Sequence, residues 1–329
     1  MAYDGKILRR ASQRFQEDCR RRRERFAERQ EAIFRRQPRL REIDGELRAS
    51  VSHIVSAAFH KGEDPRLALE GLRRENLSLQ RERRELLVQM GLPEDCLEEK
   101  PACPLCQDSG YRDGRMCRCL RSYCAREQQR ELSRMLDLGS QSFETFSLEW
   151  YSEETDPALG ISARENMDWV YRTCRAYAEG FGPESGNLLL TGDPGLGKTF
   201  LSAAIAREVS GEGWSVVYDT ASHIFEGLED RKFGREEEDG ENVERVYRCD
   251  LLILDDLGTE MTTAFVQSAL YGLVNSRLLE RRSTILSTNL QLESLGRRYS
   301  PQIASRLEGE YQILPFFGQD IRRLKRERG

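Results

Sequence analysis

The stretch NLLLTGDPGLGKTF, residues 187–200, decides the fold of this chain. It opens with an apolar run typical of a buried strand, and a helix-like run, residues 201–209, follows it. Between the two runs the sequence matches the pattern G-x-x-x-x-G-K-[ST] with Gly192, Gly197, Lys198 and Thr199. A strand that passes through a glycine-rich turn into a helix is the context that a phosphate-binding P-loop requires. The stretch therefore predicts a nucleotide site.

The chemistry of such a loop follows from its geometry. Glycines let the backbone fold tightly around phosphate oxygens, and the N–H groups at the start of the helix bind the anion. Lys198 is predicted to reach the β- and γ-phosphates of ATP, while the Thr199 hydroxyl is predicted to bind Mg²⁺. We expect the nucleotide to contact the whole loop, which is Gly192, Asp193, Pro194, Gly195, Leu196, Gly197, Lys198, Thr199 and Phe200.

A second acidic half of the site is predicted in LLILDDLG, residues 251–258. Two aspartates follow the apolar run, at the carboxyl end of a strand, where open α/β sheets bind their ligands. Asp255 is predicted to act on Mg²⁺ through a water molecule, and Asp256 to orient or deprotonate the attacking water. Taken alone, the segment is better interpreted as a buried strand followed by an acidic turn. Together with the P-loop it is typical of a Walker B segment.

The chain from about residue 143 onward alternates apolar runs with amphipathic segments. The predicted strands are residues 187–190, 215–218, 251–254, 284–287 and 311–314. Strands that alternate with helices indicate βαβ units, so we expect an α/β domain with a central, mostly parallel sheet. Residues 236–244 are mostly acidic and predict an exposed loop.

The N-terminal residues predict helices instead. Apolar side chains recur every three or four residues over 40–58 and again over 69–90, with a break at 60–65. Two such helices form an antiparallel hairpin or a short coiled coil, and they either pack only on each other or offer a docking surface to a partner's helices. We divide the chain into a helical region (1–98), a zinc module (99–126), a linker helix (127–142) and an ATPase domain (143–329).

The zinc module rests on cysteine spacing. Cys103 and Cys106 form C-x-x-C, and Cys117 and Cys119 form C-x-C after ten intervening residues. Four thiolates joined by a short glycine-containing loop suit a tetrahedral structural Zn²⁺ site. Because C-x-C is a cramped pair, Cys124 is the alternative fourth ligand. The other alternative is reduced thiols without metal.

Composition narrows the classes of protein. The 329 residues are 33% charged with a net charge of -5, which argues against a wholly basic nucleic-acid binder. The local arginine run at 20–25 is a solvated helix face or a nucleic-acid patch. We find no apolar run of the roughly 18 to 20 residues that a membrane span needs, and no secretory signal. We therefore expect a cytoplasmic protein whose nine cysteines are thiols or metal ligands.

Residues 140–325 resemble the AAA+ ATPases, and within them the DnaC/IstB branch of bacterial helicase loaders and transposition helpers. The resemblance rests on ordered signals: FETF near residue 143, GDPGLGKT, LLILDDLG, STN at 287–289 and IASRLEG at 303–309. It implies that Asn289 is the sensor-1 residue that helps to place the lytic water. It also implies that Arg306 is an arginine finger, which reaches the γ-phosphate of a neighbouring subunit. A finger of this kind requires self-association.

The resemblance implies a function as well. It points to an ATPase that loads the replicative DNA helicase onto single-stranded DNA and uses hydrolysis as its switch. The alternative is a transposition helper that assembles on duplex DNA and recruits a transposase. A third hypothesis is an adaptor in which the ATPase fold is only a scaffold.

Two features depart from the family pattern. Most AAA+ proteins have Glu where this chain has Asp256, which predicts slower turnover. The chain also ends soon after the last predicted strand, which leaves little room for a helical lid, so Arg322 is the residue that could replace the lid arginine.

Overall fold

The computed structural model describes residues 3–59, 65–135, 141–234 and 240–328. The described residues form two compact units. The sheet unit combines those of Met1–Arg14 and Met116–Gly329, and the helical unit is made of those of Phe15–Arg115. The domain boundaries expected after residues 98, 126 and 142 stay predictions.

The helical unit confirms a helical N-terminal region. Its elements are α2 (Pro38–Phe59), α3 (Pro65–Gln89) and most of α1 (Gly5–Arg36). Arg39, near the start of α2, makes two hydrogen bonds of 2.8 and 3.0 Å to Glu82, near the end of α3, so these helices are antiparallel. The predicted break at 60–65 lies almost wholly outside the described residues. A small apolar core holds the base of the hairpin and contains Phe34, Leu40, Leu87 and Leu97.

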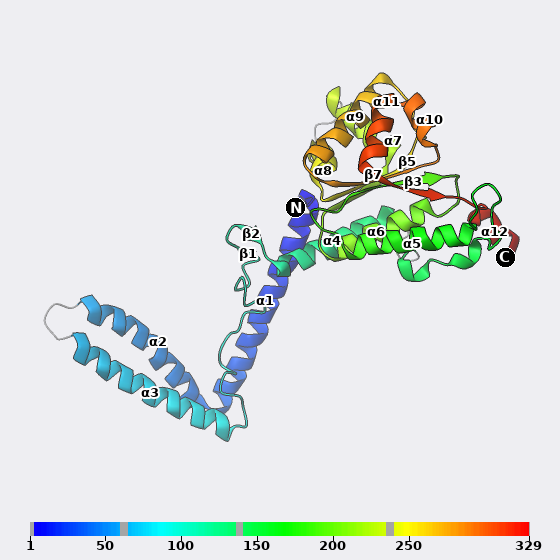
Figure 1. Cartoon of the computed structure of the whole chain (residues 1–329). Helices are drawn as coiled ribbons and strands as arrows, with labels where there is room; N and C mark the ends of the chain where they lie inside the picture. Colours follow the sequence, from blue (N-terminus) through cyan, green and yellow to red (C-terminus); the bar gives the residue numbers. More distant parts are fainter. Residues whose placement is uncertain (1–2, 60–64, 136–140, 235–239, 329) are drawn as a thin grey trace. The chain divides into compact units, whose positions relative to one another are not determined.

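The sheet unit contains a five-stranded parallel sheet with strand order β4-β5-β6-β3-β7 (Figure 1). The strands are β3 (Asn187–Gly192), β4 (Val216–Thr220), β5 (Leu251–Leu257), β6 (Ser283–Thr288) and β7 (Tyr311–Phe316). All five strands expected from the sequence are confirmed, and so is the α/β class. Parallel strands that are covered on both faces have nearly continuous apolar runs, which is why these segments stood out in the sequence.

Helices cover both faces of this sheet (Figure 1). One face packs against α4 (Arg118–Met135), α5 (Ala163–Glu179) and α6 (Lys198–Gly211). The other packs against α7 (Ala221–Lys232), α8 (Gly240–Arg248), α9 (Ala264–Leu279), α10 (Leu292–Arg298) and α11 (Pro301–Glu310). Leu188 and Leu190 of β3 enter the first core and Leu189 the second, as the two-residue period of a strand requires.

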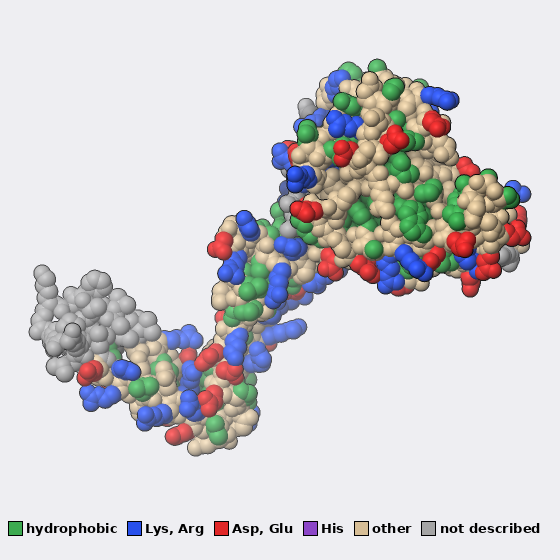
Figure 2. Space-filling model, viewed as in Figure 1, with side chains coloured by type: hydrophobic (Ala, Val, Ile, Leu, Met, Phe, Trp, Pro, Cys, Tyr) green, Lys and Arg blue, Asp and Glu red, His purple; other side chains and the backbone are tan. Residues whose placement is uncertain are grey.

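Two local predictions need correction. The acidic residues 236–244 were expected to form a loop, but Gly240–Arg248 is α8, and residues 235–239 lie outside the described part. The linker helix expected over 127–142 is part of a helix that begins earlier, because α4 starts at Arg118. Acidic and basic side chains are interspersed on the visible face of the sheet unit, in keeping with the small net charge (Figure 2).

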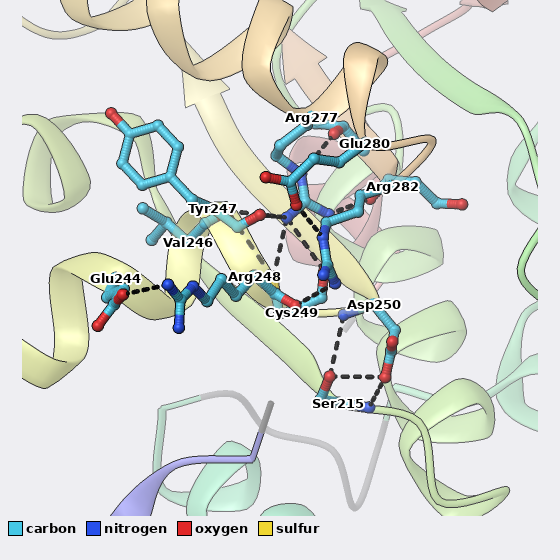
Figure 3. Close-up of polar contacts among 12 residues, drawn as sticks. Ser215, Glu244, Val246, Tyr247, Arg248, Cys249, Asp250, Arg277, Glu280 and Arg282 are labelled. Carbon is cyan, nitrogen blue, oxygen red and sulfur yellow. Dashed lines mark hydrogen bonds and ion pairs between the residues drawn. The ribbon is translucent and has the colours of Figure 1, made fainter. Parts of the chain in front are cut away.

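A buried arginine ties α8 to the sheet (Figure 3). Arg277 of α9 is only 1% exposed, and its guanidinium donates at 2.6 to 3.3 Å to five oxygen atoms. These are the carbonyls of Val246, Tyr247, Cys249 and Ser283 and the hydroxyl of Thr284. The arginine therefore caps the carboxyl end of α8, where the helix dipole favours a cation.

No helix among the described residues is long and apolar enough to cross a bilayer.

Candidate functional site

The P-loop runs from the end of β3 to the start of α6, as predicted. Gly192 has a φ of 139°, and a Cβ there would lie 2.0 Å from the carbonyl oxygen of Phe316 in β7. Gly197 has a φ of 95° and forms the N-cap of α6. Only glycine accepts both the left-handed backbone and the close strand, so the motif's two glycines are explained by geometry.

Lys198 is the cation of this loop. Its side chain is buried, and Nζ donates to the carbonyls of Gly192 and Asp193 at 2.6 and 2.7 Å. Burial lowers the pKa of Lys198, whereas the charges of Asp256, Asp255 and Asp193 oppose that shift. The ammonium is thus held over the loop by acceptors that a phosphate can replace.

A pocket of about 300 Å³ opens above the loop. Its polar lining includes residues from the ends of three strands and from the last helix: Lys198, Thr199, Asp256, Thr259, Asn289 and Arg322. Its apolar lining is largely aromatic and includes Phe146, Trp150, Tyr151 and Phe200. A cation, a hydroxyl and a carboxylate on one side and aromatic rings on the other suit a nucleotide with its phosphates over α6.

Asp256 enters this pocket because β5 is irregular. The register between β5 and β6 shifts between Leu254 and Leu257, and Asp256 has a left-handed φ of 56°. Its amide donates to Ser287 Oγ at 3.0 Å. Burial and then the neighbouring charge of Asp255 raise the pKa of Asp256, which makes it a stronger base. The placement fits the general-base role expected for it, which stays a prediction.

Asp255 does not line the pocket. It is buried within β5, accepts a 2.7 Å hydrogen bond from Tyr218 Oη and accepts another from Ser287 Oγ. Both hydroxyls come from strands that flank β5. The Mg²⁺ role expected for Asp255 therefore has to operate through water or after these hydrogen bonds rearrange, and it remains a prediction.

Of the remaining P-loop residues, Pro194, Gly195, Thr199 and Phe200 line the pocket, whereas Asp193 does not. Leu196 instead turns its side chain into the hydrophobic core, and its carbonyl accepts a 2.9 Å hydrogen bond from Tyr151 Oη. Only the backbone of Leu196 is left to contact a nucleotide.

The C-terminal helix α12 (Ile321–Arg328) completes the pocket. The Ile321 amide donates to the Gly195 carbonyl at 3.1 Å, so this helix starts against the P-loop. Gly195 has a φ of 79°, and a Cβ there would lie 2.0 Å from Asp320 Oδ1. Arg322 and Lys325 consequently face the pocket. The sequence raised Arg322 only as a candidate, and it gave no signal for Lys325.

The aromatic side was missed from the sequence. Phe146 lies 5.5 Å from the Phe200 ring, centroid to centroid, and 5.3 Å from the Tyr171 ring. Trp150 lies under Lys325, whose Nζ is 5.4 Å from the ring centroid. The FETF segment marked only the domain start, although its second phenylalanine is a pocket residue.

The family resemblance implied roles for Asn289 and Arg306, and only Asn289 lies at the pocket of its own chain. Asn289 follows β6 and lines the pocket beside Asp256. Arg306 is on α11, is exposed to solvent and does not line its own pocket. An exposed position fits an arginine that acts on a second copy, and both roles stay predictions.

The cysteine cluster is a feature of residues 103–119. The four Sγ atoms of Cys103, Cys106, Cys117 and Cys119 lie within 4.8 Å of one another, which confirms that the predicted ligands come together. Strands β1 (Tyr111–Arg112) and β2 (Arg115–Met116) form a small hairpin between the two pairs. Cys119 lies in the first turn of α4, which relieves the cramped C-x-C spacing. Cys124 is outside the cluster, and burial raises the pKa of its thiol to about 11.

We expect Cys106→Ser to lower the zinc content of the purified chain from about one ion to near none. Four thiolates are needed for the closed tetrahedral site, so loss of one opens it to water and chelators. Atomic absorption after gel filtration measures the content. Cys96→Ser, a half-buried cysteine outside the cluster, is the control and should keep the metal. A wild-type chain that contains no zinc after growth with added zinc would leave the four thiols as reduced cysteines.

The parallel sheet, the P-loop and the pocket residues define a P-loop nucleotide-binding domain. Residues 177–305 match the family described as IstB-like ATP binding protein. This part of the chain is thus similar to the ATP-binding domains of the DnaC/IstB branch of the AAA+ proteins.

Individual relatives come from both kinds of protein in this branch. The replicative helicase loader DnaC of Escherichia coli K12 is 26% identical over 148 residues, which are 44% of this chain and 60% of that protein. A putative insertion sequence ATP-binding protein of Sinorhizobium fredii is 34% identical over 103 residues, 31% of this chain and 34% of the relative. A crystal structure of the DnaC helicase loader is similar over 55% of this chain and 99% of that one, at 19% identity and a TM-score of 0.45. The chain thus spans at most about three fifths of the length of these curated relatives.

Proposed function

We propose that this protein is an ATPase that loads the replicative DNA helicase onto DNA. ATPase activity is supported by one observation: Lys198, Thr199 and Asp256 line the same pocket, which has space for a nucleotide. Lys198 and the α6 N-terminus bind the phosphates, and Mg²⁺ on Thr199 neutralises their charge when it is bound. Asp256 takes a proton from the attacking water, and Asn289 orients that water. The loader relatives and this pocket support the proposal together.

The loader is favoured over the transposition helper by what precedes the ATPase domain. A hairpin of α2 and α3 comes first, and a cysteine cluster that ends in the first turn of α4 follows it. We propose that the hairpin docks on the helicase. Leu77 and Val88 of α3 are apolar and strongly exposed, at 45% and 61%, so a partner helix can cover them.

The contact with single-stranded DNA is proposed at the end of α7. Lys232 Nζ lies 4.9 Å from the centroid of the Phe265 ring, and Phe233 next to it is 57% exposed. A cation beside aromatic rings can pair with the DNA backbone while bases stack on the rings. The neighbouring Arg235 lies outside the described residues.

The first experiment is co-elution of the purified chain with the host's replicative helicase, with ATP and with ADP, after nuclease treatment. We expect a complex with ATP that survives removal of DNA. Leu77→Glu should weaken it, because a carboxylate on the hairpin would have to be buried. Leu159→Glu, a similarly exposed leucine in the sheet unit, is the matched control and should leave it intact.

Absence of a complex with either nucleotide would favour the transposition helper. Electron microscopy of the chain on duplex DNA with ATP would then be expected to show filaments, which a loader specific for single strands does not form.

A further inference from the structure

The loop after the acidic strand end contains a buried carboxylate with no role in the proposed chemistry. Glu260 is 7% exposed and lies between β5 and α9. One of its carboxylate oxygens accepts the Gly258 amide at 3.0 Å, and the other accepts the hydroxyl of Tyr299. Burial of an ionisable group costs stability unless hydrogen bonds compensate, so this arrangement needs an explanation.

The partners of Glu260 fix the end of α10. Tyr299 directly follows this helix and is 2% exposed. Arg298, the last residue of α10, donates from Nη2 to the Glu260 carbonyl at 2.5 Å. Its own carbonyl accepts Nε2 of Gln267 in α9 at 3.0 Å. The backbone and the side chain of Glu260 therefore hold the same helix end.

The loop fixed in this way contains pocket residues. Thr259, which lines the pocket, donates from its hydroxyl to the Asp256 carbonyl at 2.9 Å. The Leu257 carbonyl accepts the Thr288 hydroxyl at 2.6 Å, directly before Asn289. If binding or loss of the γ-phosphate moves Asp256 or Thr259, the loop that contains Glu260 therefore moves as well.

Helix α10 transmits such a displacement to α11 because the two helices are closely packed. A Cβ on Gly296 of α10 would lie 3.2 Å from Cβ of Ala304 in α11, which is shorter than an ordinary van der Waals contact. Close-packed elements move together rather than deform. Arg306 lies two residues beyond Ala304 on α11.

We propose that the Glu260–Tyr299 contact is a positioning element that couples each nucleotide pocket to the helix pair holding Arg306. Arg306 would contact the phosphate that is bound in the pocket of a second copy of this chain. Nucleotide state in one subunit would then set the position of the arginine that serves its neighbour. The inference rests on the proposed function, because the finger role of Arg306 is itself a prediction.

The first test separates positioning from nucleotide binding. Glu260→Gln and Tyr299→Phe should each lower kcat about tenfold and leave KM within about twofold, because the lost contact acts on geometry rather than on ATP affinity. Glu293→Gln removes an exposed carboxylate from the same helix α10 and should keep the wild-type kcat. Tryptophan fluorescence confirms that each variant is folded. An unchanged kcat, or a change confined to KM, would overturn the proposal.

The second test asks whether Glu260 acts through Arg306. Arg306→Ala alone should lower kcat, and adding Glu260→Gln to it should lower kcat no further. Losses that multiply would show that Glu260 acts only on its own pocket, which contradicts the coupling. An Arg306→Ala chain with wild-type turnover would also overturn it, while turnover that depends on Lys198 would leave the proposed ATPase standing.

Discussion

Lys198→Ala should lower ATP turnover about a hundredfold or more, because it removes the one cation that the P-loop places on the phosphates. In the structure Nζ is held by the carbonyls of Gly192 and Asp193, with Asp256 among the charges near it. Phosphate release from ATP by the purified wild type and variant measures the effect. The variant should remain folded, since the substitution removes a buried charge and affects only two acceptors, both carbonyls of the P-loop backbone.

The control for this variant is Lys232→Ala, assayed without DNA. Lys232 is an exposed lysine at the end of α7 and does not line the pocket, so its loss should leave turnover unchanged. Equal turnover in Lys198→Ala and wild type would mean that the measured activity comes from elsewhere. A wild type with no turnover at all, alone or with helicase and DNA, would favour the scaffold adaptor.

The parts of the fold that were predictable are those with a local sequence signal. The strand before Gly192 and the strand before Asp255 are apolar runs because both faces of a parallel strand are buried. The P-loop was predictable because its glycines are required by backbone geometry that any such loop shares. The cysteine pairs were predictable because ligand spacing is short-range.

Features that depend on distant residues were not predictable. Gly240–Arg248 is helical although residues 236–244 are mostly acidic, because Val246 is buried and Arg277 caps the helix end from α9. The left-handed backbone at Asp256 depends on the irregular pairing of β5 with β6 and on Ser287. Asp256 and Asp255 are adjacent in sequence, yet only one faces the pocket, and the sequence alone had placed both there.

The largest effect on stability is expected at Arg277. Arg277→Ala should lower the free energy of unfolding of the sheet unit by about 3–5 kcal/mol, because it leaves several buried acceptors without donors and opens a cavity. Arg277→Lys should recover part of this loss, since an ammonium keeps the charge but cannot match the planar fork of a guanidinium. Urea unfolding measures both. The three tryptophans, Trp150, Trp169 and Trp214, all belong to the sheet unit, so their fluorescence follows this unit separately.

A surface arginine is the control for the Arg277 variants. Arg172 is exposed and pairs with Asp168 one helical turn earlier, so Arg172→Ala should change stability by less than about 1 kcal/mol. Arg277 differs because it is buried and its partners are mainly carbonyls, at the carboxyl end of α8 and the start of β6. If Arg277→Ala unfolded at the wild-type urea concentration, α8 would have to be held by its apolar contacts alone. A selective loss would instead show that one buried cation fixes α8 onto the sheet whose strand ends form the nucleotide pocket.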